Sequence, residues 1–175
     1  MSEKRIQWEK PGGWRLVVDE IRHPNGTLVE RALVEHPGSV VLVPLRGRNV
    51  IMLRQQRPAL KQRILELPAG TRAWDEPWEQ CAQRELREET GYRADLLREL
   101  GQIWPAPGIT DEVMTVFLAT GLSPDPLPGD FDEDISLAPM PLDDLVAMAL
   151  DGRLQDAKSV VGVLRVFHYL QSQMA

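Results

Sequence analysis

The order of apolar and polar residues predicts strands in the first part of the chain. Residues 14–22 and 27–36 read as extended segments, and residues 23–26 (His-Pro-Asn-Gly) between them are turn sequence. Asn-Gly favours a tight turn because both residues adopt positive φ at low cost. The first 36 residues therefore predict either a small antiparallel appendage or a part of the main sheet.

Further extended segments follow. Residues 39–45 (SVVLVPL) form a continuous, largely β-branched run, which is typical of a strand buried on both faces. A polar turn at 46–49 leads to residues 50–56, so these two runs predict a hairpin. Residues 63–70 (RILELPAG) predict one more extended piece.

The pattern becomes helical between residues 77 and 90. Trp78, Cys81, Ala82, Glu85, Leu86 and Glu89 recur at steps of three and four. Pro77 suits the first helical position, and Gly91 suits a C-terminal stop. We therefore expect one helix here, inserted between strands.

The remaining elements complete a mixed pattern. We expect strands at 96–103, 113–120 and 135–140, a loop at 123–134, and helices at 142–150 and from Asp156, a good N-cap, to about 171. Strands in the first and middle parts, with one inserted and two terminal helices, predict an α+β or mixed α/β fold in which helices cover a mixed sheet.

Composition narrows the class of protein. The chain has 175 residues and a net charge of −6, with no basic stretch, which argues against binding of nucleic acid. No segment approaches the roughly 18 apolar residues of a membrane span, and the N-terminus does not resemble a signal peptide. The single cysteine, Cys81, fits a reducing compartment. We therefore expect a cytoplasmic protein without membrane or nucleic-acid partners.

Three glutamates of the predicted helix share one side. Glu85 lies three residues before Glu88 and four before Glu89, so their carboxylates repel one another, by about 0.2–0.5 kcal/mol per pair in an isolated helix. Arg84 pairs favourably with Glu88, but a divalent cation would relieve the repulsion better, and Mg²⁺ or Mn²⁺ prefers such oxygen ligands. The alternative is a solvated acidic helix face.

The spacing around these glutamates favours a metal site. The order Gly-x5-Glu-x7-Arg-Glu-Leu-x-Glu-Glu-x-Gly-aromatic, over residues 70–92, resembles the Nudix box of the Nudix hydrolases, which cleave nucleoside diphosphates linked to another moiety. So many fixed positions match by chance with a probability of at most about 10⁻⁷. The one departure is Tyr92, where an aliphatic residue is usual. The resemblance implies an α/β/α sandwich with a mixed sheet.

The resemblance also implies roles for individual residues. It makes Glu85 and Glu89 ligands of Mg²⁺, or of Mn²⁺ in its place, and Glu88 a further ligand or a base acting through water. The Ala69 carbonyl is an additional candidate ligand. Arg84 is expected to hold the glutamates through salt bridges, and Glu76 to orient Arg84 or the loop.

Features outside the box resemble the ADP-ribose pyrophosphatase branch. Pro107 lies fifteen residues beyond Tyr92, and residues 53–58 (LRQQRP), 65–70 (LELPAG) and 152–159 (GRLQDAKS) are similar to segments of that branch. The resemblance implies that the substrate is contacted by Arg57, Ala106, Pro107, Gly108 and Glu112. The alternatives are a plain type II turn at Pro107-Gly108 and a solvated strand end at Arg57.

Two assignments depend on regions with weaker signals. The acidic loop 130–134 offers Glu133 as a metal ligand or base, but Phe131 stands where the family often has a glutamate, so the base is Asp132, Glu133 or Glu88. Trp8 and Trp14 lie in the N-terminal region, which in this branch is exchanged between subunits. Trp14 could stack on adenine, although a core or interface role is the commoner one.

Together these features predict an ADP-ribose diphosphatase, which forms AMP and ribose 5-phosphate and acts as a homodimer. We expect an N-terminal β region at 1–37, open to exchange between subunits, and a catalytic domain at 38–175. The alternatives are hydrolysis of another nucleoside diphosphate sugar such as GDP-mannose, of a dinucleoside polyphosphate, or a module that binds ADP-ribose without cleaving it.

Overall fold

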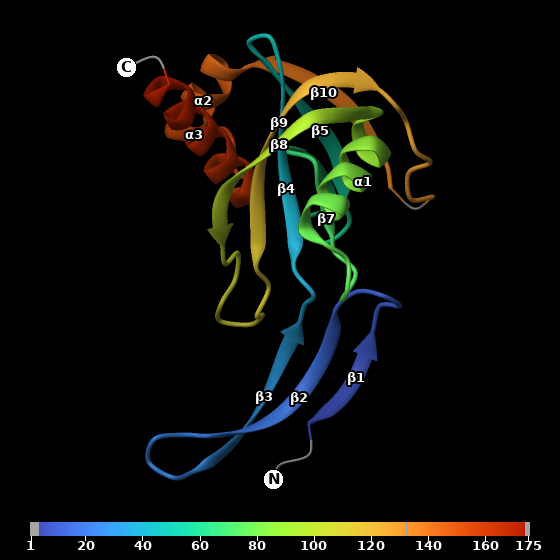
Figure 1. The fold of residues 1–175 in the computed structure, drawn as a ribbon. Coiled ribbons are helices and arrows are strands. Elements are labelled where there is room, and N and C mark those ends of the chain that lie inside the picture. The colour runs from blue at the N-terminus through green and yellow to red at the C-terminus, as the bar shows by residue number, and fades with distance from the viewer. Residues whose placement is uncertain (1–3, 132, 174–175) are drawn as a thin grey trace.

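The computed structural model describes residues 4–131 and 133–173, which form a small N-terminal sheet and a larger sheet with helices on both faces (Figure 1). The N-terminal sheet extends away from one end of the larger sheet. Its three antiparallel strands are β1 (Arg5–Glu9), β2 (Arg15–Arg22) and β3 (Leu28–Glu35). The small antiparallel appendage predicted from the first 36 residues is therefore present, with one additional strand, β1.

The larger sheet has the strand order β10-β5-β4-β9-β8, with β6 paired to β5 and β7 paired to β4. Its strands are β4 (Ser39–Arg46), β5 (Asn49–Arg57), β6 (Gln62–Glu66), β7 (Ala69–Thr71), β8 (Tyr92–Ile103), β9 (Met114–Pro124) and β10 (Ile135–Pro141). β4 and β9 are parallel, whereas the other pairs are antiparallel. The sheet is mixed, as the sequence predicts.

Three helices cover the two faces of this sheet. They are α1 (Trp78–Thr90), α2 (Leu142–Leu150) and α3 (Ala157–Ser172). β4 is buried on both faces, so its alternate side chains enter different cores: Val40 and Leu42 pack with α1, whereas Val41 and Val43 pack with α2 and α3. This arrangement is the predicted α/β/α sandwich. No helix of the described residues is long and apolar enough to cross a membrane.

Several boundaries differ from the prediction. Pro77 precedes α1 as its N-cap, with extended ψ, and is not the first helical residue. The predicted strand 63–70 is divided into β6 and β7, because Leu67 and Pro68 leave the pairing with β5 and the Pro68 carbonyl accepts a hydrogen bond from Leu42 N–H. The strands β8 and β9 are longer than predicted, since they pair beyond the apolar runs that mark them.

The break between β6 and β7 positions the site. β7 pairs with the beginning of β4, with Gly70 opposite Val40, and α1 packs on the same end of the sheet. The backbone at Ala69 and Gly70 therefore lies directly beneath the helix that carries the glutamates.

Candidate active site

The apolar face of α1 determines where its glutamates point. Cys81, Ala82 and Leu86 are buried against the sheet, and Glu85 and Glu89 follow the same side at helical spacing. Both glutamate residues are consequently more than nine-tenths buried. The helix ends as predicted at Gly91, which has φ of 76° and donates its N–H to the Arg87 carbonyl.

Gly70 allows Glu85 to approach the backbone of β7. A Cβ atom at position 70 would lie 1.8 Å from Glu85 Cδ and 2.1 Å from each carboxylate oxygen. Gly70 does not have positive φ, so its requirement is for space and not for an unusual backbone conformation. One residue earlier, Ala69 N–H donates a hydrogen bond of 2.8 Å to Glu89 Oε2. The Ala69-Gly70 backbone and the two glutamates therefore form one compact unit.

Arg84 joins the other members of the predicted set. Its Nε and Nη2 each lie 2.9 Å from an oxygen of Glu76, and its Nη1 contacts Glu85 at 2.7 Å and Glu88 at 2.9 Å. The predicted i,i+4 pair of Arg84 and Glu88 is therefore present. Hydrogen bonds to Glu76 raise the pKa of Arg84, and the same pairing lowers the pKa of Glu76. Glu76 orients Arg84, and Arg84 in turn compensates two acidic side chains of α1.

Burial makes it costly for Glu85 and Glu89 to carry a negative charge. It raises the pKa of Glu85 to about 7, although Arg84 opposes the shift. It also raises the pKa of Glu89 well above its usual value, and the neighbouring Glu85 and Glu133 add to that effect. The two carboxyl groups have raised pKa values because they are buried and the single arginine beside them does not supply enough positive charge to offset this. A cation would supply the rest.

The site fits a divalent metal in its chemistry. Its donors are carboxylate oxygens and backbone, the ligands of hard cations, and the Glu85 carboxylate occupies the space that a Cβ at Gly70 would fill. Among the described residues, however, no three acidic, histidine or cysteine side chains converge closely enough to hold an ion as they stand. In this arrangement Arg84 and the Ala69 N–H engage the carboxylates.

Glu133 belongs to the loop that precedes β10. It lines a cavity of about 220 Å³ together with Glu88 and Glu89, and Gln55 Nε2 lies 3.5 Å from Glu133 Oε1. The structure thus brings the loop before β10 to the glutamate helix, as the sequence predicts. The other candidate in this loop, Asp132, lies outside the described residues.

Arg57 and Glu112 line a second cavity, of about 430 Å³, which Ala69 and Gly70 also border. Arg57 is not a solvated strand end, because its Nε and Nη2 form bonds of 2.9 and 2.7 Å with the two carboxylate oxygens of Glu66. Burial opposes the charge of Arg57, but the hydrogen bonds to Glu66 outweigh it and raise the pKa. Glu112 accepts a hydrogen bond from Ser39 Oγ.

The loop before β9 lies further from the glutamates. Pro107 lines a cavity of about 490 Å³ between this loop and the N-terminal sheet. The Ala106 carbonyl accepts hydrogen bonds from the N–H groups of Ile109 and Thr110. Gly108 does not have positive φ, so the alternative of a type II turn is wrong.

Trp14 stays within the N-terminal part. Its ring centroid lies 4.7 Å from that of Trp8. The nearby Gly13 carbonyl accepts a hydrogen bond of 3.0 Å from Trp74 Nε1, which ties this part of the chain to the loop before α1. Within one chain, the described contacts do not bring Trp14 to the glutamates.

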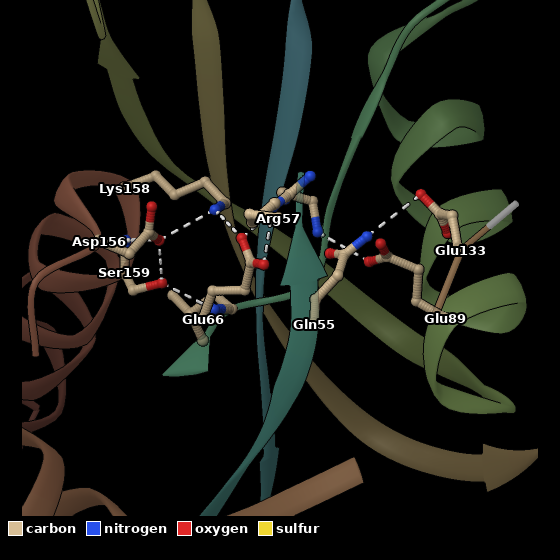
Figure 2. A network of polar contacts seen from close by, with 10 residues as sticks. Gln55, Arg57, Glu66, Glu89, Glu133, Asp156, Lys158 and Ser159 are labelled. Atoms are coloured by element: carbon tan, nitrogen blue, oxygen red, sulfur yellow. Dashed lines mark hydrogen bonds and ion pairs between the residues drawn. The ribbon is translucent and has the colours of Figure 1, made fainter. Parts of the chain in front are cut away.

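Sequence reasoning missed a polar network at the start of α3 (Figure 2). Glu66 is fully buried and binds both Arg57 and Lys158, while Asp156 and Ser159 extend the network to the helix. The signal was a lysine and a serine placed on the buried side of a predicted helix, where apolar residues are expected.

The comparisons with known proteins agree with this geometry. The NUDIX domain family matches residues 35–161. The chain is 35% identical to the methanol dehydrogenase activator of Bacillus methanolicus, over 99% of this chain and 95% of that protein. It is 34% identical to the ADP-ribose pyrophosphatase of Bacillus subtilis (strain 168), over 99% and 98% of the two chains.

A solved structure shows the same fold. The crystal structure of an ADP compounds hydrolase superposes with a TM-score of 0.82 at 22% identity, covering 98% of this chain and 93% of that one. The chain belongs to the NUDIX family, and it is a Nudix pyrophosphohydrolase. Enzymes of this family use divalent metal ions, which the donor set on α1 and β7 fits.

The close approach at Gly70 leads to a direct prediction. In Gly70→Ala the new Cβ displaces the Glu85 carboxylate, so we expect hydrolytic activity to fall at least about 100-fold, the upper end of what disturbing the support of a metal ligand costs. Steady-state assays with saturating divalent metal measure this. Gly13→Ala is the matched control, because its Cβ meets only the flexible Lys10 side chain, and it should retain activity. Full activity in Gly70→Ala would contradict the placement of Glu85.

Proposed function

We propose that this protein is a Mg²⁺-dependent diphosphatase that hydrolyses the pyrophosphate linkage of ADP-ribose, giving AMP and ribose 5-phosphate. The observation that carries the proposal is the pair of buried carboxyl groups, Glu85 and Glu89, next to a cavity lined by Arg57. Sequence similarity to a protein named ADP-ribose pyrophosphatase supports the choice of substrate. This similarity covers nearly the whole length of both chains.

We assign the metal to Glu85, Glu89 and the Ala69 carbonyl, with Glu88 and Glu133 as further ligands. When bound, the ion would neutralise phosphate oxygens and lower the pKa of a bound water. The charge that the metal carries would also remove the cost of burying the two ionised glutamates.

Glu133 is our preferred general base. Glu88 Oε2 lies 2.9 Å from Arg84 Nη1, so this oxygen is already engaged in an ion pair. Glu133 lines the same cavity as Glu88 and Glu89, so it can reach a water held between them. Arg84 and Glu76 then serve to hold the glutamates in place.

Arg57 and Glu112 are assigned to the substrate. The Arg57 guanidinium supplies positive charge for the phosphates in an otherwise acidic protein. Glu112 lines the same cavity and is suited to accept hydrogen bonds from ribose hydroxyls. We assign Ala106, Pro107 and Gly108 to the adenosine side together with Trp14, which we expect to come from a second subunit.

A substrate panel tests the proposal. Purified protein with Mg²⁺ is incubated with ADP-ribose, GDP-mannose and a dinucleoside polyphosphate, and the products are separated by ion-exchange chromatography. We expect ADP-ribose to have the highest kcat/KM and AMP to appear with ribose 5-phosphate. Faster cleavage of another diphosphate would reject ADP-ribose as the preferred substrate, but hydrolysis of a pyrophosphate linkage would remain the reaction.

Binding without cleavage is the remaining alternative. A module of that kind would bind ADP-ribose and release no product, and Glu89→Gln would leave its affinity unchanged. In the enzyme, Glu89→Gln abolishes turnover by removing a metal ligand. The presence of Glu85, Glu88 and Glu89 together favours the enzyme.

We also propose a homodimer in which residues 1–37 pack on the catalytic part, 38–175, of a second copy. Large apolar side chains are exposed on the N-terminal sheet, with Ile6 at 53% and Trp8 at 50%. Sedimentation equilibrium should give the mass of two 19.8-kDa chains, and Trp8→Glu should weaken the association. Leu150→Glu, at a site exposed on α2, is the control. A single-chain mass at micromolar concentration would reject the dimer.

The proposed location is the cytoplasm. Cys81, the only cysteine, is buried and unpaired, which fits a reducing compartment. Recovery of the protein outside the cytoplasmic fraction of its native cell would contradict this.

A further inference from the structure

Arg57 does not stand alone at its cavity. It uses Nε and Nη2 to bind both oxygens of Glu66, and within the described part of the chain Nη1 makes no hydrogen bond. The guanidinium is therefore fixed in orientation on one edge and open on the other. About 38% of the Arg57 side chain is exposed, whereas Glu66 is fully buried.

Glu66 receives a second cation from a distant part of the chain. Lys158 Nζ lies 2.5 Å from Glu66 Oε2 and 2.9 Å from Asp156 Oδ2. Only about a tenth of the Lys158 side chain is exposed, and both of its acceptors are carboxylates. A lysine held in this way is committed to the network and does not extend into solvent.

The start of α3 keeps Lys158 in register with β6. Asp156 caps the helix by accepting a bond of 3.1 Å from Ser159 N–H, and Ser159 Oγ accepts one of 2.7 Å from Leu67 N–H, the residue after β6. Figure 2 shows Asp156, Lys158 and Ser159 on one side of Arg57, whereas Glu89 and Glu133 lie together on its other side. Charges on both sides act on Arg57, since Glu89 and Asp156 each contribute to raising its pKa.

Charge balance gives Lys158 a role beyond packing. Arg57 and Lys158 together neutralise Glu66 and Asp156, so the four side chains carry no net charge. Without Lys158 two carboxylates would share one guanidinium, and the cluster would carry a charge of −1 beside a cavity that must admit an anion. The extra carboxylate would also draw Arg57 inward, away from the cavity.

We propose that Lys158 is a positioning residue for substrate binding: through Glu66 it fixes the Arg57 guanidinium at the cavity and leaves its charge available to the diphosphate. This inference rests on the proposed function, in which Arg57 binds the phosphates. Lys158 acts through Arg57 and does not itself contact the substrate.

A double-mutant cycle tests the inference with the full-length protein and the diphosphate that the wild type cleaves fastest in the panel. Lys158→Met removes the charge and keeps the length of the side chain. We expect KM to rise about tenfold with kcat changed less than about twofold, which is the signature of an interaction lost equally from the bound substrate and from the transition state. In an Arg57→Ala background the same substitution should change KM less than about twofold.

Four further variants separate positioning from stability. Lys158→Arg should keep KM within about threefold of wild type, because the charge is retained. Asp156→Asn, which remains a good N-cap, should not raise KM, and combined with Lys158→Met it restores neutrality and lowers KM again. This pair also replaces Lys158→Met in the cycle if the single variant does not fold. Lys10→Met, at an exposed position, is the control.

The outcomes are distinct. An equal effect of Lys158→Met with and without Arg57 would overturn the inference, since Lys158 would then act on the substrate directly or through the fold. A fall in kcat with unchanged KM would overturn it as well. Turnover by the wild type tests the proposed function separately: if no diphosphate of the panel is cleaved, the function fails before the cycle begins.

Discussion

The burial of two carboxyl groups, Glu85 and Glu89, against the backbone of β7 is the constraint on which the site depends. Ionised carboxylates in such a place are costly unless positive charge compensates them, and Arg84 is shared between Glu76, Glu85 and Glu88. Their raised pKa values express that deficit. The site is therefore built to receive a cation, and the absence of a side chain at Gly70 provides the space for Glu85.

The fold meets this constraint from both faces of the sheet. α1 delivers the glutamates from one face, whereas α3, on the other, reaches through Lys158 to Glu66 and so to Arg57. The short segment between β6 and β7 is the meeting point, because Leu67 is bonded to Ser159 of α3 and Ala69 to Glu89 of α1. The residues proposed to bind the metal and the substrate are thus connected through one stretch of backbone.

Much of this could be predicted from the sequence because the relevant signals are local. Each signal spans only a short stretch of sequence. These signals are the β-branched run of β4, the glycine that ends α1 and the spacing of the glutamates. The pairing of Arg84 with Glu88 follows from helical geometry alone. The start of α3 at Asp156 was equally readable, as a side-chain cap.

The remainder depends on contacts between distant residues. Glu66 and Lys158 are 92 positions apart, and neither one's neighbours in sequence indicate a buried ion pair. β1 was missed because all five of its residues are exposed, so burial leaves no pattern in it. The need for glycine at position 70 is likewise visible only once α1 is packed above it.

The most direct test of the account is the proton balance of metal binding. Burial raises the pKa of Glu85 to about 7, so below that pH a bound cation has to displace its proton, and we expect the affinity for Mg²⁺ to rise as the pH increases towards 7. Calorimetric titration at pH 6, in buffers with different ionisation enthalpies, measures the protons released. The account predicts net release in the wild type, reduced in Glu85→Gln. Binding of Mg²⁺ without proton release, and with the same affinity at pH 6 and pH 8, would contradict it.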